Sequence, residues 1–495
     1  MKRFCICMAV WFALQAGPTA AQAVKQEPDR NPERRGIRRL SDDEIRSLST
    51  PRKKPKKFDL DARKSIFVTD LAIMKLFTFE ELMKRLASES GPQQVTKEEL
   101  FQQWWDTANP ASTFTLPFGG PNCDSGLLNT FPYTCPRNEG QQVIFNAFGP
   151  PATPATYTAI ALSNRFDLTT PPAKGGGDCG EYRIVFERNS GAATGPPNRN
   201  LIIFEAVLPN PHPDPHSLKG CRPIQDFWES LSDPSLSVAT RGARLHDFYY
   251  EGLHHAHIEP VVMAKHYGSA APNADGQVRT NQFMTGSAPQ IWMLRQFHIV
   301  NDAAGMKFIP VIVATNPPAS LFDETIAQPL GPGFRTDFLN QVAPLSVAST
   351  DPYAIDDISM ETASTYAGGE SQETPPPTPG PMDYTAAFAN SPSFKLAIQG
   401  KIPASSTLTP ADIVSRAQTQ SCAGCHHISV GAQLGGGVGP WPATLGPTGF
   451  QFTHEQLAPP FDLSGGADGP RYQISDALKN VFLPFRKHII ETFLQ

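Results

Sequence analysis

The stretch Leu201-Ile-Ile-Phe-Glu-Ala-Val-Leu208 is rich in β-branched and aliphatic residues, and it predicts a β-strand. Similar runs, separated by loops rich in Gly, Pro and Asn, occur at 143–145, 157–162, 182–186, 290–300 and 308–313. A helical stretch lies between the two groups of strands, and its clearest pieces are 224–231 and 243–250. This pattern predicts an α+β domain over 112–362, dominated by antiparallel strands. With 38 Gly and 49 Pro in 495 residues, the composition also favours a loop-rich, sheet-containing body.

The region before this domain predicts a helical segment over 58–111 and a charged arm over 24–57. Apolar residues between 58 and 86 recur at helical spacing. A capping box, Thr96-Lys-Glu-Glu99, predicts a second helix over 96–106. The arm contains twelve Lys or Arg against six Asp or Glu. Such an arm is typical of a solvated, disordered tether, with weak contact to an anionic surface as the alternative.

The N-terminus has the pattern of an export signal. Two basic residues precede an apolar run over 4–14, and Ala21-Gln-Ala23 matches a signal-peptidase site. We expect residues 1–23 to be cleaved and the mature protein to be periplasmic or extracellular. No stretch reaches the roughly eighteen apolar residues that a transmembrane helix needs. Because the chain is exported and has a formal net charge of −5, nucleic acid is not an expected partner.

Residues 363–383 predict a linker, because they contain Gly368-Gly369 and Pro375-Pro-Pro-Thr-Pro379-Gly-Pro381. This linker separates the sheet-rich domain from a C-terminal unit over 384–495. The Cys-x-x-Cys-His motif lies in the unit that follows this boundary.

The C-terminal unit contains Cys422-Ala-Gly-Cys425-His426 directly after a predicted helix. Thr409-Pro-Ala-Asp412 begins that helix with an N-cap, a proline at the first helical position and an early acidic residue. In Cys-x-x-Cys-His each thiol adds across one haem vinyl group and the histidine binds the iron. Cys422, Cys425 and His426 share one helix face, so all three can meet one porphyrin. We therefore predict one covalent haem c with His426 as the proximal ligand.

Other interpretations of the motif stay open. A structural disulfide or a thioredoxin-like pair would use Cys422 and Cys425, although no βαβ pattern surrounds them. A zinc site would need further Cys or His ligands at regular spacing, and no second Cys-x-x-Cys exists.

This C-terminal unit resembles the class I cytochrome c family, in the motif, in the helix before it and in a final helix predicted from Ser475. In that family the C-terminal helix packs against the motif helix over a haem. The resemblance implies a small all-α haem domain that follows the sheet-rich body, with thioether bonds at Cys422 and Cys425 and iron ligation at His426.

The family commonly supplies a distal methionine after the motif, whereas the last methionine here is Met382, ahead of it. His454 lies at a family-like distance downstream and is the preferred sixth ligand. His488 on the final helix, a water molecule or an open position are the alternatives.

The body is similar to uncharacterised secreted bacterial proteins that often end in a Cys-x-x-Cys-His unit. The similarity is carried by Ser163-Asn-Arg-Phe-Asp-Leu168, Cys179-Gly-Glu-Tyr-Arg-Ile-Val185, Ile203-Phe-Glu205 and Gly276-Gln-Val-Arg-Thr-Asn281. It implies this architecture and no particular activity.

Four further cysteines remain after signal cleavage, and an oxidising compartment allows them to form disulfides. Local pairing gives Cys123 with Cys135 and Cys179 with Cys221, although spacing alone does not fix the connectivity.

Two other polar groups have both a chemical and a structural interpretation. His254-His-x-His257 is a candidate metal-binding cluster, with a solvated loop as the preferred interpretation. Glu181 with Arg183, and Arg165 with Asp167, would suit acid–base chemistry, but an ion-pair network that stabilises the sheet is preferred.

The predicted function is redox. We expect an exported monohaem c-type protein that transfers electrons or carries out haem-dependent oxidation, with its large domain binding a redox partner protein or a small-molecule substrate. The alternative is a disulfide-stabilised secreted binding or surface protein in which the Cys-x-x-Cys-His unit is structural or vestigial. Enzymatic activity stays open, because the sequence contains no hydrolase or kinase signature.

Overall fold

The structure is a computed structural model of the chain. It describes residues 59–105, 126–133, 147–150, 153, 156–170, 177–189, 200–212, 217–268, 276–284, 291–302, 305–347, 353–373, 380–442, 455–456 and 461–495. The chain divides into two units, Met1–Arg30 and Asn31–Gln495, and all described residues belong to the second. The predicted signal peptide, the basic arm, the strand at 143–145, Cys123, Cys135 and His454 lie outside the described residues.

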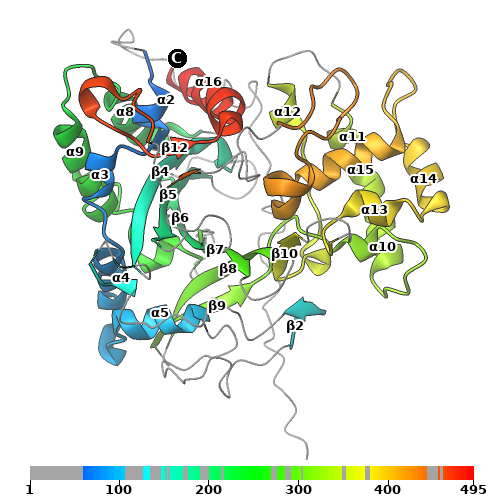
Figure 1. The fold of residues 1–495 in the computed structure, drawn as a ribbon, viewed down its shortest axis with the longest axis horizontal. Helices are drawn as coiled ribbons and strands as arrows, with labels where there is room; N and C mark the ends of the chain where they lie inside the picture. The colour runs from blue at the N-terminus through cyan, green and yellow to red at the C-terminus, as the bar shows by residue number, and fades with distance from the viewer. Residues whose placement is uncertain are drawn as a thin grey trace, which may run out of the picture. The chain divides into compact units, whose positions relative to one another are not determined.

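Eight strands of the described chain form one antiparallel sheet (Figure 1). The order is β1-β4-β5-β6-β7-β8, and β9 and β10 share the far edge of β8. The strands are β1 (Phe67–Val68), β4 (Tyr157–Arg165), β5 (Asp178–Arg188), β6 (Asn200–Pro209), β7 (Gln277–Met284), β8 (Ile291–Asp302), β9 (Gly305–Val311) and β10 (Glu370–Glu373). The predicted antiparallel, sheet-rich body is therefore confirmed.

One face of the sheet is apolar and is covered by helices. Tyr182 of β5 stacks on Trp228 of α8 (Arg222–Ser230) at 6.1 Å and meets Phe248 of α9 (Val238–Tyr250) edge-on at 5.5 Å. Phe186, two pleats along β5, packs against Phe79 at the start of α4 (Phe79–Ser88). Because alternate side chains of a strand share a face, this face buries the main apolar core.

The opposite face carries the charged residues of the same strands. The register pairs Arg165 of β4 with Glu181, Arg183 with Glu205 of β6, and Arg279 of β7 with Gln296 of β8. Directly opposite residues of an antiparallel pair lie on one face, and alternate residues of a strand do too. This charged face is the one that meets the motif described below.

The N-terminal region corrects one prediction. The predicted helix over 58–86 is divided into α2 (Ala62–Ser65), α3 (Leu71–Met74) and α4, because β1 separates α2 from α3 and pairs with Ser163 and Leu162 of β4. Periodicity alone did not show this strand, since it has only two residues. The helix predicted over 96–106 is confirmed as α5 (Lys97–Trp105).

The predicted linker over 363–383 also contains regular structure. Residues 370–373 form β10, which pairs with β8 from Arg295 to Trp292. Just before it, a Cβ on Gly369 would lie 2.4 Å from Leu128, in the hairpin of β2 (Gly126–Leu128) and β3 (Phe131–Tyr133). A polar four-residue strand has no apolar run to mark it, so only the pairing with β8 identifies it.

The rest of the described chain is mainly helical. It also contains a short antiparallel pair of strands, β11 (Glu455–Gln456) and β12 (Gln473–Ile474). The helices are α10 (Gly331–Phe338), α11 (Val342–Leu345), α12 (Ala354–Asp357), α13 (Tyr384–Phe388), α14 (Pro392–Gln399), α15 (Pro410–Thr419) and α16 (Leu483–Leu494). None of the helices in the described part of the chain combines the length and apolar character that crossing a membrane requires.

The final helix α16 packs against the body, close to α8 and α2 (Figure 1). Phe493 meets Phe166 at 4.6 Å, and Arg222 of α8 donates to the carbonyl of Leu494 at 2.9 Å. The main partners of the motif helix α15 are instead α13, α14 and α11. The expected packing of the final helix on the motif helix is therefore replaced by packing on the body.

Candidate functional site

The helix α15 delivers the motif, as predicted. Thr409 is the predicted N-cap, and in the structure it forms a capping box with Asp412: the Asp412 carboxylate accepts from the Thr409 main chain at 2.7 Å, and the Thr409 hydroxyl accepts from the Asp412 main chain at 3.2 Å. Arg416 is fully buried and donates to four main-chain carbonyls, of Leu345, Val347, Leu434 and Gly435, at 2.5–2.8 Å. Through Leu345 and Val347 these bonds attach the end of α11 to α15, and through Leu434 and Gly435 they attach the loop that follows the motif.

The motif itself forms a tight helical turn that becomes π-helical over Gly424–Ile428. The main chain of Cys425 donates to Ser421 at 2.8 Å. A Cβ on Gly424 would lie 1.8 Å from the carbonyl of Gln418, so only glycine fits between the two cysteines. The turn places Cys422, Cys425 and His426 on one short stretch of helix, and all three keep part of their surface exposed.

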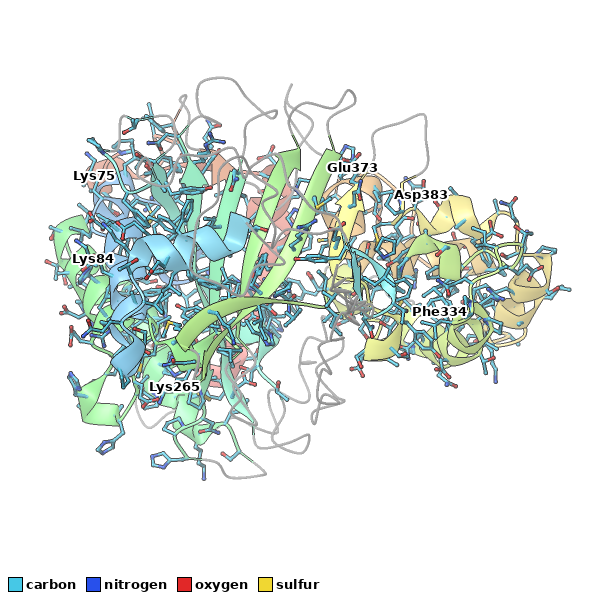
Figure 2. All side chains as sticks on the ribbon, turned by 90° about the horizontal axis from the view of Figure 1, so that it is seen from below. Lys75, Lys84, Lys265, Phe334, Glu373 and Asp383 are labelled. Atoms are coloured by element: carbon cyan, nitrogen blue, oxygen red, sulfur yellow. A yellow bond between two sulfur atoms is a disulfide. The ribbon has the colours of Figure 1, made fainter. Side chains whose placement is uncertain are left out.

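The sheet edge holds this turn from the other side. The fully buried Ser371 of β10 accepts a hydrogen bond from the main chain of Ala423 at 2.9 Å. Two residues along the strand, the buried carboxylate of Glu373 lies 2.9 Å from Nδ1 of His427. Figure 2 shows Glu373 where the strands meet the helices that follow β10. The strand β10 therefore contacts the motif at Ala423 and the residue directly after the motif, His427, about one helical turn apart.

His426 packs against the sheet through an aromatic contact. Its ring lies 5.2 Å from the ring of Trp292 on β8, and Trp292 is buried. The loss of hydration, with a contribution from the positive charges of Arg279 and Arg183, lowers the pKa of His426 to about 4. At neutral pH the imidazole is therefore uncharged, which is the form that binds a metal ion.

The two cysteines of the motif both retain thiols. Burial raises the pKa of the Cys422 thiol. Redox-active Cys-x-x-Cys pairs depend on a lowered thiol pKa, so this environment does not favour a thioredoxin-like pair. After the motif the chain turns back, and the indole of Trp441 donates to the carbonyl of Cys425 at 3.2 Å.

Charged residues of the sheet lie beside the motif. Arg183 contacts Glu181 at 2.5 Å and Glu205 at 3.0 Å, and Arg279 contacts Glu205 at 3.3 Å. Glu205 is fully buried and also accepts from Gln277 at 2.5 Å. The predicted ion-pair network across the sheet is thus present. Its closeness to the motif was not predicted, because the two parts are about 140 residues or more apart along the chain.

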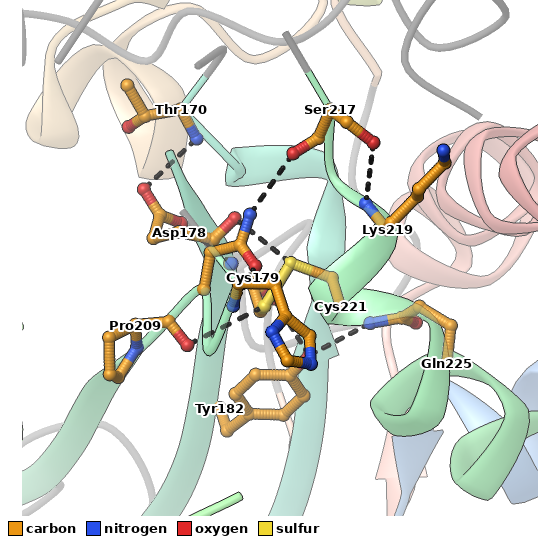
Figure 3. The surroundings of a disulfide bond; sticks show 12 residues. Thr170, Asp178, Cys179, Tyr182, Pro209, Ser217, Lys219, Cys221 and Gln225 are labelled. Carbon is orange, nitrogen blue, oxygen red and sulfur yellow. Dashed lines mark hydrogen bonds between the residues drawn. A yellow bond between two sulfur atoms is a disulfide. The ribbon is translucent and has the colours of Figure 1, made fainter. Parts of the chain in front are cut away.

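The predicted bond between Cys179 and Cys221 is present (Figure 3). It joins the start of β5 to the residue before α8, with the Cα atoms 5.2 Å apart. Asp178 beside it accepts from the main chain of Thr170 and Gly180, which closes the loop around the disulfide.

The remaining predicted residues have other surroundings. His254, His255 and His257 are exposed, as the loop interpretation expected. His488 stacks on Tyr353 at 4.9 Å. Among the described residues, no group of three or more His, Cys, Asp or Glu side chains is arranged to hold a metal ion.

Arg165 binds Asp167 through two guanidinium nitrogens, at 2.9 and 2.8 Å, so this pair is part of the predicted ion-pair network. Sequence reasoning missed the roles of Trp292, Ser371 and Glu373. Their only local signal is alternation within two strands, which does not show what lies above the sheet.

No known protein family, curated protein or solved structure matches this chain.

Proposed function

We propose that this protein is an exported monohaem c-type redox protein in which Cys422, Cys425 and His426 hold one covalent haem. The observation that carries the proposal is the joint presentation of two thiols and one uncharged imidazole on a single helical turn. This donor set fits haem c, which requires two thioether positions and one proximal nitrogen. When bound, the haem supplies a one-electron iron couple.

The protein's own residues fix the orientation of this donor set. Ser371 and Glu373 anchor the turn on β10, Trp292 supports the ring of His426, and Trp441 restrains the carbonyl of Cys425. Second contacts of this kind orient metal ligands and adjust their affinity. We infer that the helices over 384–442 are the haem-carrying part and that the sheet-rich body binds the redox partner or substrate.

Export is part of the same proposal, because haem c is attached outside the cytoplasm. The disulfide between Cys179 and Cys221 supports it, since disulfides persist in oxidising compartments. The same disulfide favours the second candidate, a secreted binding protein without haem.

A pyridine-haemochrome spectrum and an intact mass distinguish the two candidates. The full chain, including the predicted signal peptide over 1–23, is produced in a host that carries the cytochrome c maturation machinery. We expect a spectrum of haem with two thioether bonds and a mass increased by one haem. The matched control is the double variant Cys422→Ser and Cys425→Ser, which should be exported without colour. A colourless wild-type protein with the mass of the bare polypeptide contradicts the haem proposal and leaves the binding protein.

A further inference from the structure

Three cationic side chains from distant parts of the chain converge on one carboxylate oxygen. Lys64 of α2, Arg241 of α9 and Arg471 just before β12 form this group, which we call the cationic cradle. Their nitrogens lie 3.0, 3.0 and 3.6 Å, in that order, from the same atom, Oδ2 of Asp468. The side chains of Arg241 and Arg471 are only 1% and 5% exposed. Both guanidiniums are therefore held away from bulk water.

Two other carboxylates lie in the same part of the molecule and have partners of their own. Asp70, which is fully buried, lies 3.0 Å from Arg471 and 3.4 Å from Arg241. Asp462 pairs instead with Arg63, outside the cradle, at 3.1 Å. Asp70 thus balances the cradle from the interior side, and the three contacts to one oxygen close it from the other side.

Asp468 reaches the cradle from a glycine-rich loop over 462–471. Two reciprocal main-chain hydrogen bonds between Asp462 and Arg471, both 2.9 Å long, close the base of this loop. Within it, Gly466 and Gly469 have φ angles of 60° and 85°, a region that glycine enters without a steric penalty. Gly466 is exposed, whereas the Asp468 side chain is 11% exposed. The loop therefore lies between the cradle and the solvent.

We propose that the cationic cradle binds a small tetrahedral oxyanion such as phosphate, and that Asp468 fills this site in the ligand-free protein. Three cations share a single oxygen of Asp468, whereas phosphate offers a separate oxygen to each of them. Guanidinium groups also match the geometry of phosphate oxygens. Because Arg241 and Arg471 are almost fully buried, the ligand is a free ion and not the headgroup of a membrane lipid. The proposal is independent of the haem.

Phosphate binding and closure of the loop exclude each other. Two anions at one position repel, so the carboxylate of Asp468 leaves when phosphate occupies the cradle. The tip of the loop then loses its contacts with the cradle. Its base stays attached to the body, because the main chain of Leu71 donates to the carbonyl of Pro470 at 3.1 Å. The site therefore couples the concentration of an external anion to the release of this loop.

Inorganic phosphate is the probe, titrated calorimetrically into the full exported chain at constant ionic strength, with chloride as the reference anion. The variant Asp468→Ala should bind phosphate at least tenfold more tightly than the wild type, because its cradle is open before binding. Adding Lys64→Ala to this variant should weaken binding about tenfold, the effect of losing one charge-assisted hydrogen bond. Lys64 is 19% exposed, so its replacement leaves the core intact. The matched control is Asp462→Ala, which removes a carboxylate of the same loop that pairs with Arg63 outside the cradle.

The comparison between these variants decides the inference. Phosphate binding by Asp468→Ala that exceeds binding by Asp462→Ala and depends on Lys64 supports the site. Equally weak binding by every variant, or binding that the loss of Lys64 leaves unchanged, overturns it. If Asp468→Ala does not fold, hydrogen exchange of the wild type decides instead. Phosphate should then accelerate exchange over 463–469 relative to chloride, and unchanged exchange there contradicts the proposal.

Discussion

Replacing Arg416 should lower the free energy of unfolding and weaken the attachment of the loop after the motif, even though this side chain touches neither cysteine. Its guanidinium is 0% exposed and donates to the carbonyls of Leu345, Val347, Leu434 and Gly435. In Arg416→Met the apolar stem is retained, but four acceptors lose their donor.

The magnitude follows from two opposing contributions. Each buried acceptor left without a donor costs about 1–3 kcal/mol. Removing a buried cation also removes the cost of dehydrating it, which is several kcal/mol. The same dehydration lowers the pKa of Arg416. The net result is a loss of about 4 kcal/mol in the free energy of unfolding. Arg416→Lys keeps the charge but has only three donors, so it should recover part of this loss.

The assay is equilibrium urea unfolding followed by circular dichroism, together with hydrogen exchange of residues 431–441. Exchange in this loop should accelerate, because Leu434 and Gly435 are no longer tied to α15. The matched control is Arg335→Met, which removes two part-buried bonds to main-chain carbonyls and should cost about 1–2 kcal/mol. A loss below about 1 kcal/mol in Arg416→Met, with unchanged exchange in the loop, would refute the reasoning.

Three further changes test the structure. Ser371→Ala leaves the main-chain N–H of Ala423 without its acceptor, and it should lower stability by about 1–2 kcal/mol and reduce the haem content of exported protein, measured by absorbance per mole of chain. Burial lowers the pKa of His298 to about 4, so between pH 6.5 and 4 the unfolded chain binds a proton there that the folded chain does not. The free energy of unfolding should therefore fall by up to ~3 kcal/mol over that range. The variant His298→Gln should flatten that part of the plot of urea midpoint against pH. Reduction of the disulfide between Cys179 and Cys221, which closes a loop with a sequence separation of 42, should cost about 4 kcal/mol, and a double Cys→Ala variant with an unchanged melting temperature would contradict this.

Much of the body followed from local sequence signals. Runs such as 201–208 alternate or concentrate apolar residues strongly enough to identify β4, β5, β6, β8 and β9, and Thr409 with Asp412 identified the start of the motif helix. The short strands β1 and β10 were not predicted. They contain two and four residues, and their stability comes from ladder bonds to β4 and β8 and not from their own composition.

The sequence by itself determined which donor groups the motif brings together, because Cys422, Cys425 and His426 are neighbours along one helix and need no distant partner to share a face. It also determined the charges of Arg183 and Arg279. Only the tertiary structure decided that these charges face the motif, that Trp292 supports His426, and that the final helix packs on the body. Pairing across a sheet joins residues that are far apart in sequence, and which ones meet depends on register and on the global fold, which no local pattern encodes.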